Sequence, residues 1–203
     1  RVRSSLGEEE IIFPPYNALQ LRDILKKRAE LAFNNDSLEE GVIEKCAAYA
    51  AREHGDARRA LDLLRVAAEV SVRGGGKKVG LKHIDIANEK IERDKMLDVI
   101  ESEPTQFQLV LYAIILLNEK EQGIIFTGDV FNIYQELCEK TRNEILTQRR
   151  ISDVLAEFDM LGIINAKVVS KGRQGRTREI KLMLSKNIKD KAKEIIEKGL
   201  GIK

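Results

Sequence analysis

The spacing of apolar residues changes once along this chain of 203 residues. Between residues 18 and 161, apolar positions recur every three or four residues, which is the period of a helix with one buried face. Over 163–169 and 180–184 they alternate with polar positions instead, which is the period of a strand. Helical periodicity over most of the chain, with one late pair of strands, predicts a mainly α protein. The content of 14 glycines and 3 prolines agrees, because a β-sandwich needs many tight turns.

Capping signals divide the first half of the chain into four predicted helices, the first of which begins near residue 18. A Ser-Leu-Glu-Glu capping box predicts the start of the second helix at residue 37, and Asp56 predicts the start of the third. The glycine-rich stretch 73–80 is predicted to be a flexible joint before the fourth. The predicted buried face of the first helix carries Leu21, Ile24, Leu25, Leu31 and Ala32.

Two polar breaks mark a predicted boundary between the halves. Residues 92–95 are all charged, and a second polar stretch ends at Pro104. Domain boundaries usually fall in polar segments of this kind, where few contacts cross. The sequence therefore predicts a helical domain over 18–93, a linker over 94–104 and a second domain over 105–203.

The second domain has the element order of a winged helix. Threonines that can cap helices stand at positions 105, 127 and 147, and Gly162 is placed to end the third helix. The two predicted strands then form a hairpin. Three helices, the last two closely joined, followed by a hairpin, are typical of a DNA-binding helix-turn-helix with an added wing.

The hairpin and the helix before it carry the predicted DNA-binding residues. Residues 167–181 contain six basic side chains and one acid, whereas the whole chain has a net charge of only +2. Arg and Gln at a helix start can make bidentate contacts in a major groove, and Arg at a wing tip is attracted into a minor groove. An ordinary solvated helix face and a solubilising turn are the alternatives. The predicted DNA contacts are Gln148, Arg149, Arg150, Ser152, Lys171, Arg173, Gln174, Arg176 and Arg178.

The sequence carries no motif of a catalytic or metal centre. The patterns GxSxG, HExxH and GxGxxG are absent, as is the phosphate loop GxxxxGK[ST]. Cys46 and Cys138 lack paired cysteines at zinc spacing, so we expect buried free thiols, and His54 and His83 are expected at the surface or at helix ends. No apolar run reaches the roughly 20 residues of a membrane span. We therefore expect no membrane partner and, with the predicted DNA contacts, a cytoplasmic protein associated with the nucleoid.

Two arginines, Arg58 and Arg59, stand in the first turn of the third predicted helix. Cations are disfavoured there, because the N-terminus is already the positive end of the helix dipole. Their presence suggests a nearby anion, since a phosphate would meet backbone N–H groups and a guanidinium together. An ion pair between Arg58 and Asp62, four residues further on, is the alternative.

Five strings of the sequence point to one family. They are Ile-Ile-Phe-Pro-Pro-Tyr at 11–16, Leu-Arg-Asp-Ile-Leu at 21–25, Gly-Asp-Ala-Arg-Arg-Ala-Leu-Asp-Leu-Leu at 55–64, Gln-Arg-Arg-Ile-Ser at 148–152 and Gly-Ile-Ile at 162–164. The chain resembles the C-terminal portion of archaeal replication initiators, which are AAA+ ATPases related to the origin-recognition complex and its loader partner. The resemblance implies a helical AAA+ lid domain followed by a winged helix, with residues 1–17 as the tail of the ATPase core and a leading segment.

The resemblance also implies the roles of particular residues. Arg58 corresponds to the second sensor, which touches the terminal phosphate of the nucleotide, and Tyr16 and Ile24 correspond to residues that approach the adenine. ATP or ADP with Mg²⁺ would bind to the full-length protein, whereas neither a cofactor nor ATP hydrolysis is expected for this chain alone. Some relatives carry an arginine finger at the position that is Ser5 here.

The function that the resemblance implies is DNA replication initiation, through origin recognition and helicase loading. The expected partners are double-stranded origin DNA, the replicative helicase and other initiator subunits. One alternative is a subunit of a branch-migration helicase, since those motors also join a lid to a winged helix; it would prefer four-way junctions. The other is a winged-helix interaction module that docks a protein such as the replicative helicase and has no affinity for DNA.

Overall fold

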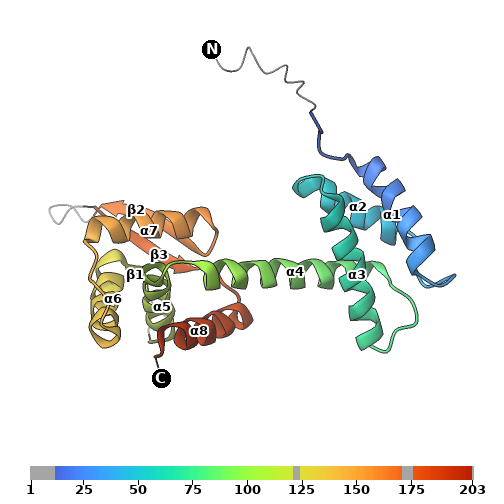
Figure 1. The fold of residues 1–203 in the computed structure, drawn as a ribbon. Helices are drawn as coiled ribbons and strands as arrows, with labels where there is room; N and C mark the ends of the chain where they lie inside the picture. The colour runs from blue at the N-terminus through green and yellow to red at the C-terminus, as the bar shows by residue number, and fades with distance from the viewer. Residues whose placement is uncertain (1–11, 121–123, 171–175, 203) are drawn as a thin grey trace, which may run out of the picture. The chain divides into compact units, whose positions relative to one another are not determined.

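The computed structural model describes residues 12–120, 124–170 and 176–202, and the chain divides into two compact units, Arg1–Glu92 and Arg93–Lys203 (Figure 1). Each unit has its own hydrophobic core. The mainly α fold class is confirmed, and the predicted lid and winged helix fall in the first and second unit. In the described part of the chain, no helix has the length and apolar character that a membrane crossing needs.

The first unit is built from helices that pack around small and branched apolar side chains. Asn17 caps the first helix with its side-chain oxygen, and Asp56 caps the third as the sequence predicts, by accepting a hydrogen bond from the N–H of Arg58. Leu21, Leu63 and Ile84 are fully buried in the core. The helices are α1 (Ala18–Ala32), α2 (Val42–Glu53), α3 (Ala57–Arg73) and the first part of α4 (Leu81–Ser102).

Two local predictions for the first unit are wrong. Leu31 is 85% exposed, because the buried stripe of α1 runs through Leu21, Leu25 and Ala29 at four-residue spacing, and Leu31 lies off it. Ala32, the last residue of α1, is exposed as well. The second helix begins at Val42 rather than at residue 37. The backbone of 37–39 instead pairs with Val79, whose N–H donates to the Ser37 carbonyl at 2.8 Å.

The segment 94–104, predicted to be a linker, is helical as far as Ser102. Helix α4 continues through it because Leu97 and Ile100 are buried in the core of the second unit. The division between the units therefore falls inside α4, after Glu92. Charged residues at 92–95 belong to an exposed part of a helix rather than to a loop, and sequence polarity alone does not distinguish the two.

The second unit has the winged-helix order, with one strand that the sequence analysis missed. The missed strand, β1, is two residues long, too short to show an alternating pattern, and the sheet order is β1-β3-β2 with both pairs antiparallel. Thr147 caps α7, and Gly162 follows it with φ +71°, as predicted. The elements are α5 (Thr105–Lys120), β1 (Ile125–Phe126), α6 (Thr127–Thr141), α7 (Gln148–Met160), β2 (Ile164–Ser170), β3 (Arg176–Leu182) and α8 (Lys186–Leu200).

The turn between α6 and α7 is held by Tyr134, which is fully buried in α6. Its hydroxyl accepts a hydrogen bond from the N–H of Leu146 at 3.0 Å and donates to the side-chain oxygen of Gln106 in α5 at 2.5 Å. Burial raises the pKa of Tyr134 to about 12, so the hydroxyl keeps its proton at physiological pH. The position of α7 thus depends on the core as well as on the connecting turn.

Candidate nucleic-acid interface

The pleat of the hairpin separates its basic residues onto two faces. Side chains alternate along a strand, so Arg176 and Arg178 share a face of β3 with buried Ile180. Lys181 lies on the opposite face, as does Lys167 of β2. The basic residues that the sequence groups together therefore do not form one surface. The arginines of β3 lie on the face that packs on the helices.

Helix α7 presents the predicted polar residues at its start. Ile151, Val154 and Leu155 are buried, which leaves Gln148, Arg149 and Arg150 exposed and Ser152 half-buried. Arg150 lies 3.9 Å from Asp153, a distant and exposed pair. Arg149 makes no ion pair with any residue that the structure describes. Its charge is thus not neutralised by a carboxylate of the described chain.

A polar hollow of about 560 Å³ lies between the hairpin and the starts of α6 and α7. It brings together four of the predicted residues, Gln148, Ser152, Arg176 and Arg178. Arg176, like Arg149, has no ion-pair partner among the described residues. Lys171, Arg173 and Gln174 lie outside the part of the chain that the structure describes. In Figure 1, α7 runs alongside the β2–β3 hairpin at one end of the unit.

Four residues of the hollow were not predicted as site residues. Thr127 and Gly128 line it from the first turn of α6, Val168, 63% exposed, lines it from β2, and Thr177 lines it from β3. Only the tertiary fold places the start of α6 beside the hairpin, so no local pattern could have indicated Thr127 and Gly128.

Arg178 differs from the other described arginines of this surface because its guanidinium makes a hydrogen bond within the protein. Its guanidinium Nη1 donates to the backbone carbonyl of Ser152 in α7 at 2.5 Å. Its backbone N–H donates to the hydroxyl of Thr127 at 3.3 Å. One residue of β3 therefore contacts both helices of the helix-turn-helix.

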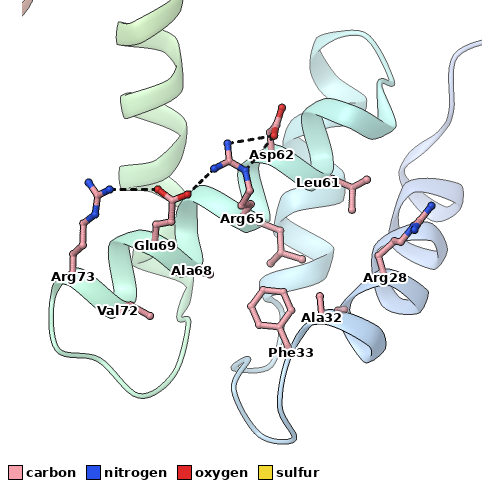
Figure 2. Close-up of a pocket in the computed structure, with 12 residues that line it drawn as sticks. Arg28, Ala32, Phe33, Leu61, Asp62, Arg65, Ala68, Glu69, Val72 and Arg73 are labelled. Carbon is pink, nitrogen blue, oxygen red and sulfur yellow. Dashed lines mark hydrogen bonds and ion pairs between the residues drawn. The ribbon is translucent and has the colours of Figure 1, made fainter.

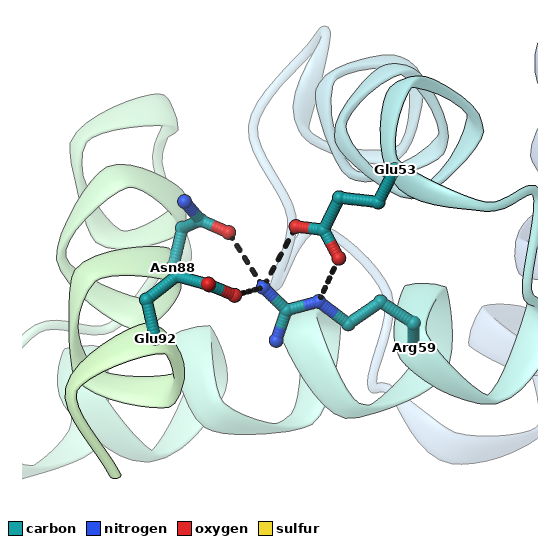
Figure 3. Close-up of polar contacts among 4 residues, drawn as sticks. All are labelled: Glu53, Arg59, Asn88 and Glu92. Carbon is teal, nitrogen blue, oxygen red and sulfur yellow. Dashed lines mark hydrogen bonds and ion pairs between the residues drawn. The ribbon is translucent and has the colours of Figure 1, made fainter. Parts of the chain in front are cut away.

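In the first unit, the neighbouring arginines of α3 have opposite surroundings. Arg59 is only 9% exposed, and its guanidinium contacts Glu53 of α2 at 3.0 Å, the amide oxygen of Asn88 at 2.9 Å, and Glu92 of α4 at 2.5 Å (Figure 3). Arg58 is exposed. The alternative of an Arg58–Asp62 ion pair is not found in the structure, because Asp62 pairs with Arg65 at 3.5 Å.

The predicted adenine-side residues lie at the beginning of the described chain. The N–H of Tyr16 donates to the carbonyl of Gly55 at 3.1 Å, in the turn that leads to Arg58. Gly55 has φ +65°, and a side chain there would collide with the backbone of Tyr16, so glycine is required. Ile24 is half-buried in α1. The structure thus brings Tyr16 to the same turn as Arg58.

The first unit also has an apolar groove of about 650 Å³ between α1 and α3 (Figure 2). Its apolar lining includes Phe33, Leu61 and Val72. The charged residues at its α3 edge neutralise one another: Figure 2 shows Arg65 held by Asp62 and by Glu69, at 2.6 Å from the latter. This groove offers apolar surface but no concentrated charge.

Neither unit carries the residues of a metal or thiol-based centre within the described ranges. No group of three or more His, Cys, Asp or Glu side chains there could hold a metal ion. Cys46 and Cys138 are both free and buried, as predicted. Burial raises the pKa of the Cys46 thiol to about 12 and also raises that of Cys138. Neither thiol is activated as a nucleophile.

Comparisons with known proteins match both units. The model of the Cdc6 AAA+ ATPase-type lid domain matches residues 22–89, and the model of the CDC6 C-terminal winged helix domain matches residues 98–192. ORC1-type DNA replication proteins of Pyrococcus furiosus and Pyrococcus abyssi are 63% and 62% identical over 182 residues, which is 90% of this chain.

A solved structure gives the same result for the fold. The Aeropyrum pernix ORC1 protein, solved in complex with DNA, is 46% identical with a TM-score of 0.73, and the match covers 98% of this chain. The chain spans 43% of the length of each Pyrococcus relative and 51% of the Aeropyrum chain. It therefore corresponds to about half of these proteins.

Proposed function

The chain belongs to the archaeal ORC1- and Cdc6-type family of DNA replication proteins, and on this premise we propose that its second unit binds double-stranded origin DNA. The start of α7 enters the major groove, and the hairpin contacts the adjacent minor groove. The observation that carries the proposal is the hollow between them, where Arg176 faces α7 without a carboxylate partner among the described residues. The Aeropyrum relative crystallised with DNA supports it.

The proposal divides the residues of this surface by task. Gln148 and Arg149 have the donors and acceptors to read base edges, while Arg150 and Arg176 are suited to phosphates. Lys171, Arg173 and Gln174, which lie between β2 and β3 in the sequence and outside the described residues, remain predicted contacts. Affinity that rests on such cations falls with salt, by about 0.9 log units per log unit of salt for each phosphate neutralised.

The test is binding of an origin duplex and of a random duplex over a salt series, measured by fluorescence anisotropy. Arg176→Ala should lower the salt slope by about 0.9. Lys181→Ala is the matched control, because Lys181 is also a cation of β3 but lies on the opposite face. Equal effects of both substitutions, or no binding by the unsubstituted protein, would refute the proposal.

For the first unit we propose a sensor role in the full-length protein. Arg58 is exposed at the start of α3, so it is free to meet the terminal phosphate of ATP, with Tyr16 and Ile24 near the adenine. The 203 residues have no phosphate loop, so ATP hydrolysis and Mg²⁺ binding would belong to the remainder of the full-length protein. Arg58→Ala in that protein should abolish its ATP-dependent change in DNA affinity while ADP still binds.

The same proposal extends to the wider process. A protein that recognises origin DNA would be associated with the nucleoid, in the cytoplasm. Its partners there would be other initiator subunits and the replicative helicase. Co-sedimentation of the full-length protein with helicase on origin DNA, but not on random DNA, is the expected result. The branch-migration alternative has no support from the relatives found.

A further inference from the structure

Among the described residues, Arg178 is the one predicted DNA-contacting arginine whose guanidinium makes a hydrogen bond within the protein. We propose that Arg178 is a positioning residue, which fixes the hairpin against α7, and that it is not a phosphate ligand. This inference rests on the proposed function, since a fixed angle between hairpin and helix matters for DNA that contacts both. It reverses the role that the basic composition of the hairpin suggests for this residue.

The direction of the side chain follows from the register of the sheet. Val168 of β2 is the cross-strand partner of Arg178, and buried Ile180 lies two residues along on the same face. This face packs on the helices, so the guanidinium extends from the edge of the core towards α7. Its Nη1 reaches the Ser152 carbonyl at 2.5 Å.

The bond to Ser152 is of a strong type. A charged donor on a neutral carbonyl makes a shorter and stronger bond than two neutral groups do. Ser152 lies in the middle of α7, where its carbonyl already faces the next turn of the helix, so the guanidinium uses the second acceptor position of that oxygen. The contact ties the hairpin to the same turn of α7 that carries Arg149.

A second bond from the same residue fixes the backbone of β3. The N–H of Arg178 donates to the hydroxyl of Thr127 at the start of α6, at 3.3 Å. The side chain and the backbone of one residue thus hold β3 to two different helices. The guanidinium groups of Arg149 and Arg176 make neither a hydrogen bond nor an ion pair with the described residues, so their charges stay available for DNA.

A positioning residue and a phosphate ligand differ in what their loss changes. Loss of a phosphate ligand removes one neutralised charge, so the salt slope falls by about 0.9 and all sequences are weakened alike. Loss of the brace, that is, of the Arg178 contacts with Ser152 and Thr127, leaves the number of phosphate contacts unchanged. It loosens the fixed angle between the hairpin and α7 that base reading needs. The ratio of specific to random affinity then falls while the salt slope stays constant.

The first experiment needs no DNA. In ¹⁵N–¹H spectra at low temperature, a guanidinium held by a hydrogen bond gives separate Nη–H signals because its rotation is slow. We expect separate signals for Arg178, assigned by their loss in Arg178→Lys, and averaged signals for Arg149. Averaged signals for both arginines would overturn the proposal, whatever the protein binds.

The second experiment uses a duplex selected by the unsubstituted protein from a random pool, and a random duplex of equal length. Arg178→Ala should lower the selected-to-random affinity ratio tenfold or more with an unchanged salt slope, whereas Arg176→Ala should lower the slope by about 0.9. Arg178→Gln, which loses the charge but keeps an amide donor, should also keep the slope, and it guards against misfolding of the alanine variant.

The outcomes separate the two proposals. A fall of about 0.9 in the slope for Arg178→Gln would show a phosphate ligand and overturn the inference. Failure of the unsubstituted protein to bind either duplex would instead overturn the proposed function, and the ¹⁵N–¹H spectra would still decide whether the brace exists.

Discussion

Arg59 and Arg65 of the first unit have surroundings opposite to those of Arg149 and Arg176 of the second. In the first unit, Arg59 is surrounded by Glu53, Asn88 and Glu92, and Arg65 lies between two acids of its own helix. In the second unit, Arg149 and Arg176 have no acidic partner among the described residues. The net charge of a segment therefore says little about binding. What matters is whether each cation is already neutralised by its own protein.

Burial explains why the difference is sharp. A guanidinium taken out of water must be paired, because its desolvation costs more than the fold can otherwise offset. Arg59 meets this condition with three side chains from two other helices. An exposed guanidinium keeps its water and needs no partner, so it remains available to an external anion.

The largest effect is expected in the reactivity of the two cysteines, one of which is buried in the core of each unit. Burial raises the pKa of Cys46 from 9.0 to about 12, which leaves roughly a thousandfold less thiolate at pH 8. We expect both thiols to react with a disulfide reagent only when their own unit opens. Labelling followed by mass spectrometry gives the two rates separately, and fast labelling of either cysteine under native conditions would contradict its burial.

The next effect concerns the neighbouring arginines of α3. Arg59→Ala removes the buried guanidinium that joins Glu53 of α2 to Asn88 and Glu92 of α4, and we expect the free energy of unfolding of the first unit to fall by about 3 kcal/mol. Arg58→Ala, one residue away and exposed, should change it by less than about 0.5 kcal/mol. Denaturant unfolding measures both, and equal losses would mean that the network around Arg59 is not what holds α2, α3 and α4 together.

A carboxylate placed in the hollow would neutralise arginines of the second unit, as Glu53 and Glu92 neutralise Arg59 in the first. Val168→Glu puts an acid beside Arg176 and Arg178, and it should weaken DNA binding about tenfold, or ~1.4 kcal/mol. Asn165→Glu adds the same charge to the same strand on the opposite face. If anisotropy shows the same loss for both variants, long-range repulsion rather than the hollow governs binding.

The smallest effect is expected at the edge of the apolar groove. Arg65→Ala removes exposed ion pairs with Asp62 and Glu69, and such pairs contribute about 0.5 kcal/mol or less. Thermal unfolding at low and at high salt should differ little between this variant and the unsubstituted protein. A loss near that of Arg59→Ala would show that exposure is the wrong criterion for ranking these arginines.

Local signals predicted most helix starts and the winged-helix order. Asp56 and Thr147 cap helices as expected, because a cap depends on neighbours in the sequence. The capping box at residue 37 fails because Val79, far along the chain, pairs with that backbone. Strand β1 was missed for a similar reason, since its two residues are a strand only through pairing with β3.

The candidate site was predictable in composition but not in arrangement. Polarity placed Gln148, Arg149 and Arg176 at the surface correctly. Nothing local indicated that Arg178 bonds to Ser152, or that Arg59 rather than Arg58 is the buried member of its pair. Both outcomes depend on which distant carbonyl or carboxylate the fold brings within reach.

The buried hydroxyl of Tyr134 holds the turn before α7, so one oxygen atom contributes to the orientation of that helix. Phenylalanine at this position would fill the same space and preserve the core, yet the amide of Leu146 would lose its acceptor. A substitution that preserves the hydrophobicity and volume of the core would therefore still alter how α7 meets DNA. Selection at this position would then act on DNA recognition, which side-chain volume alone does not reveal.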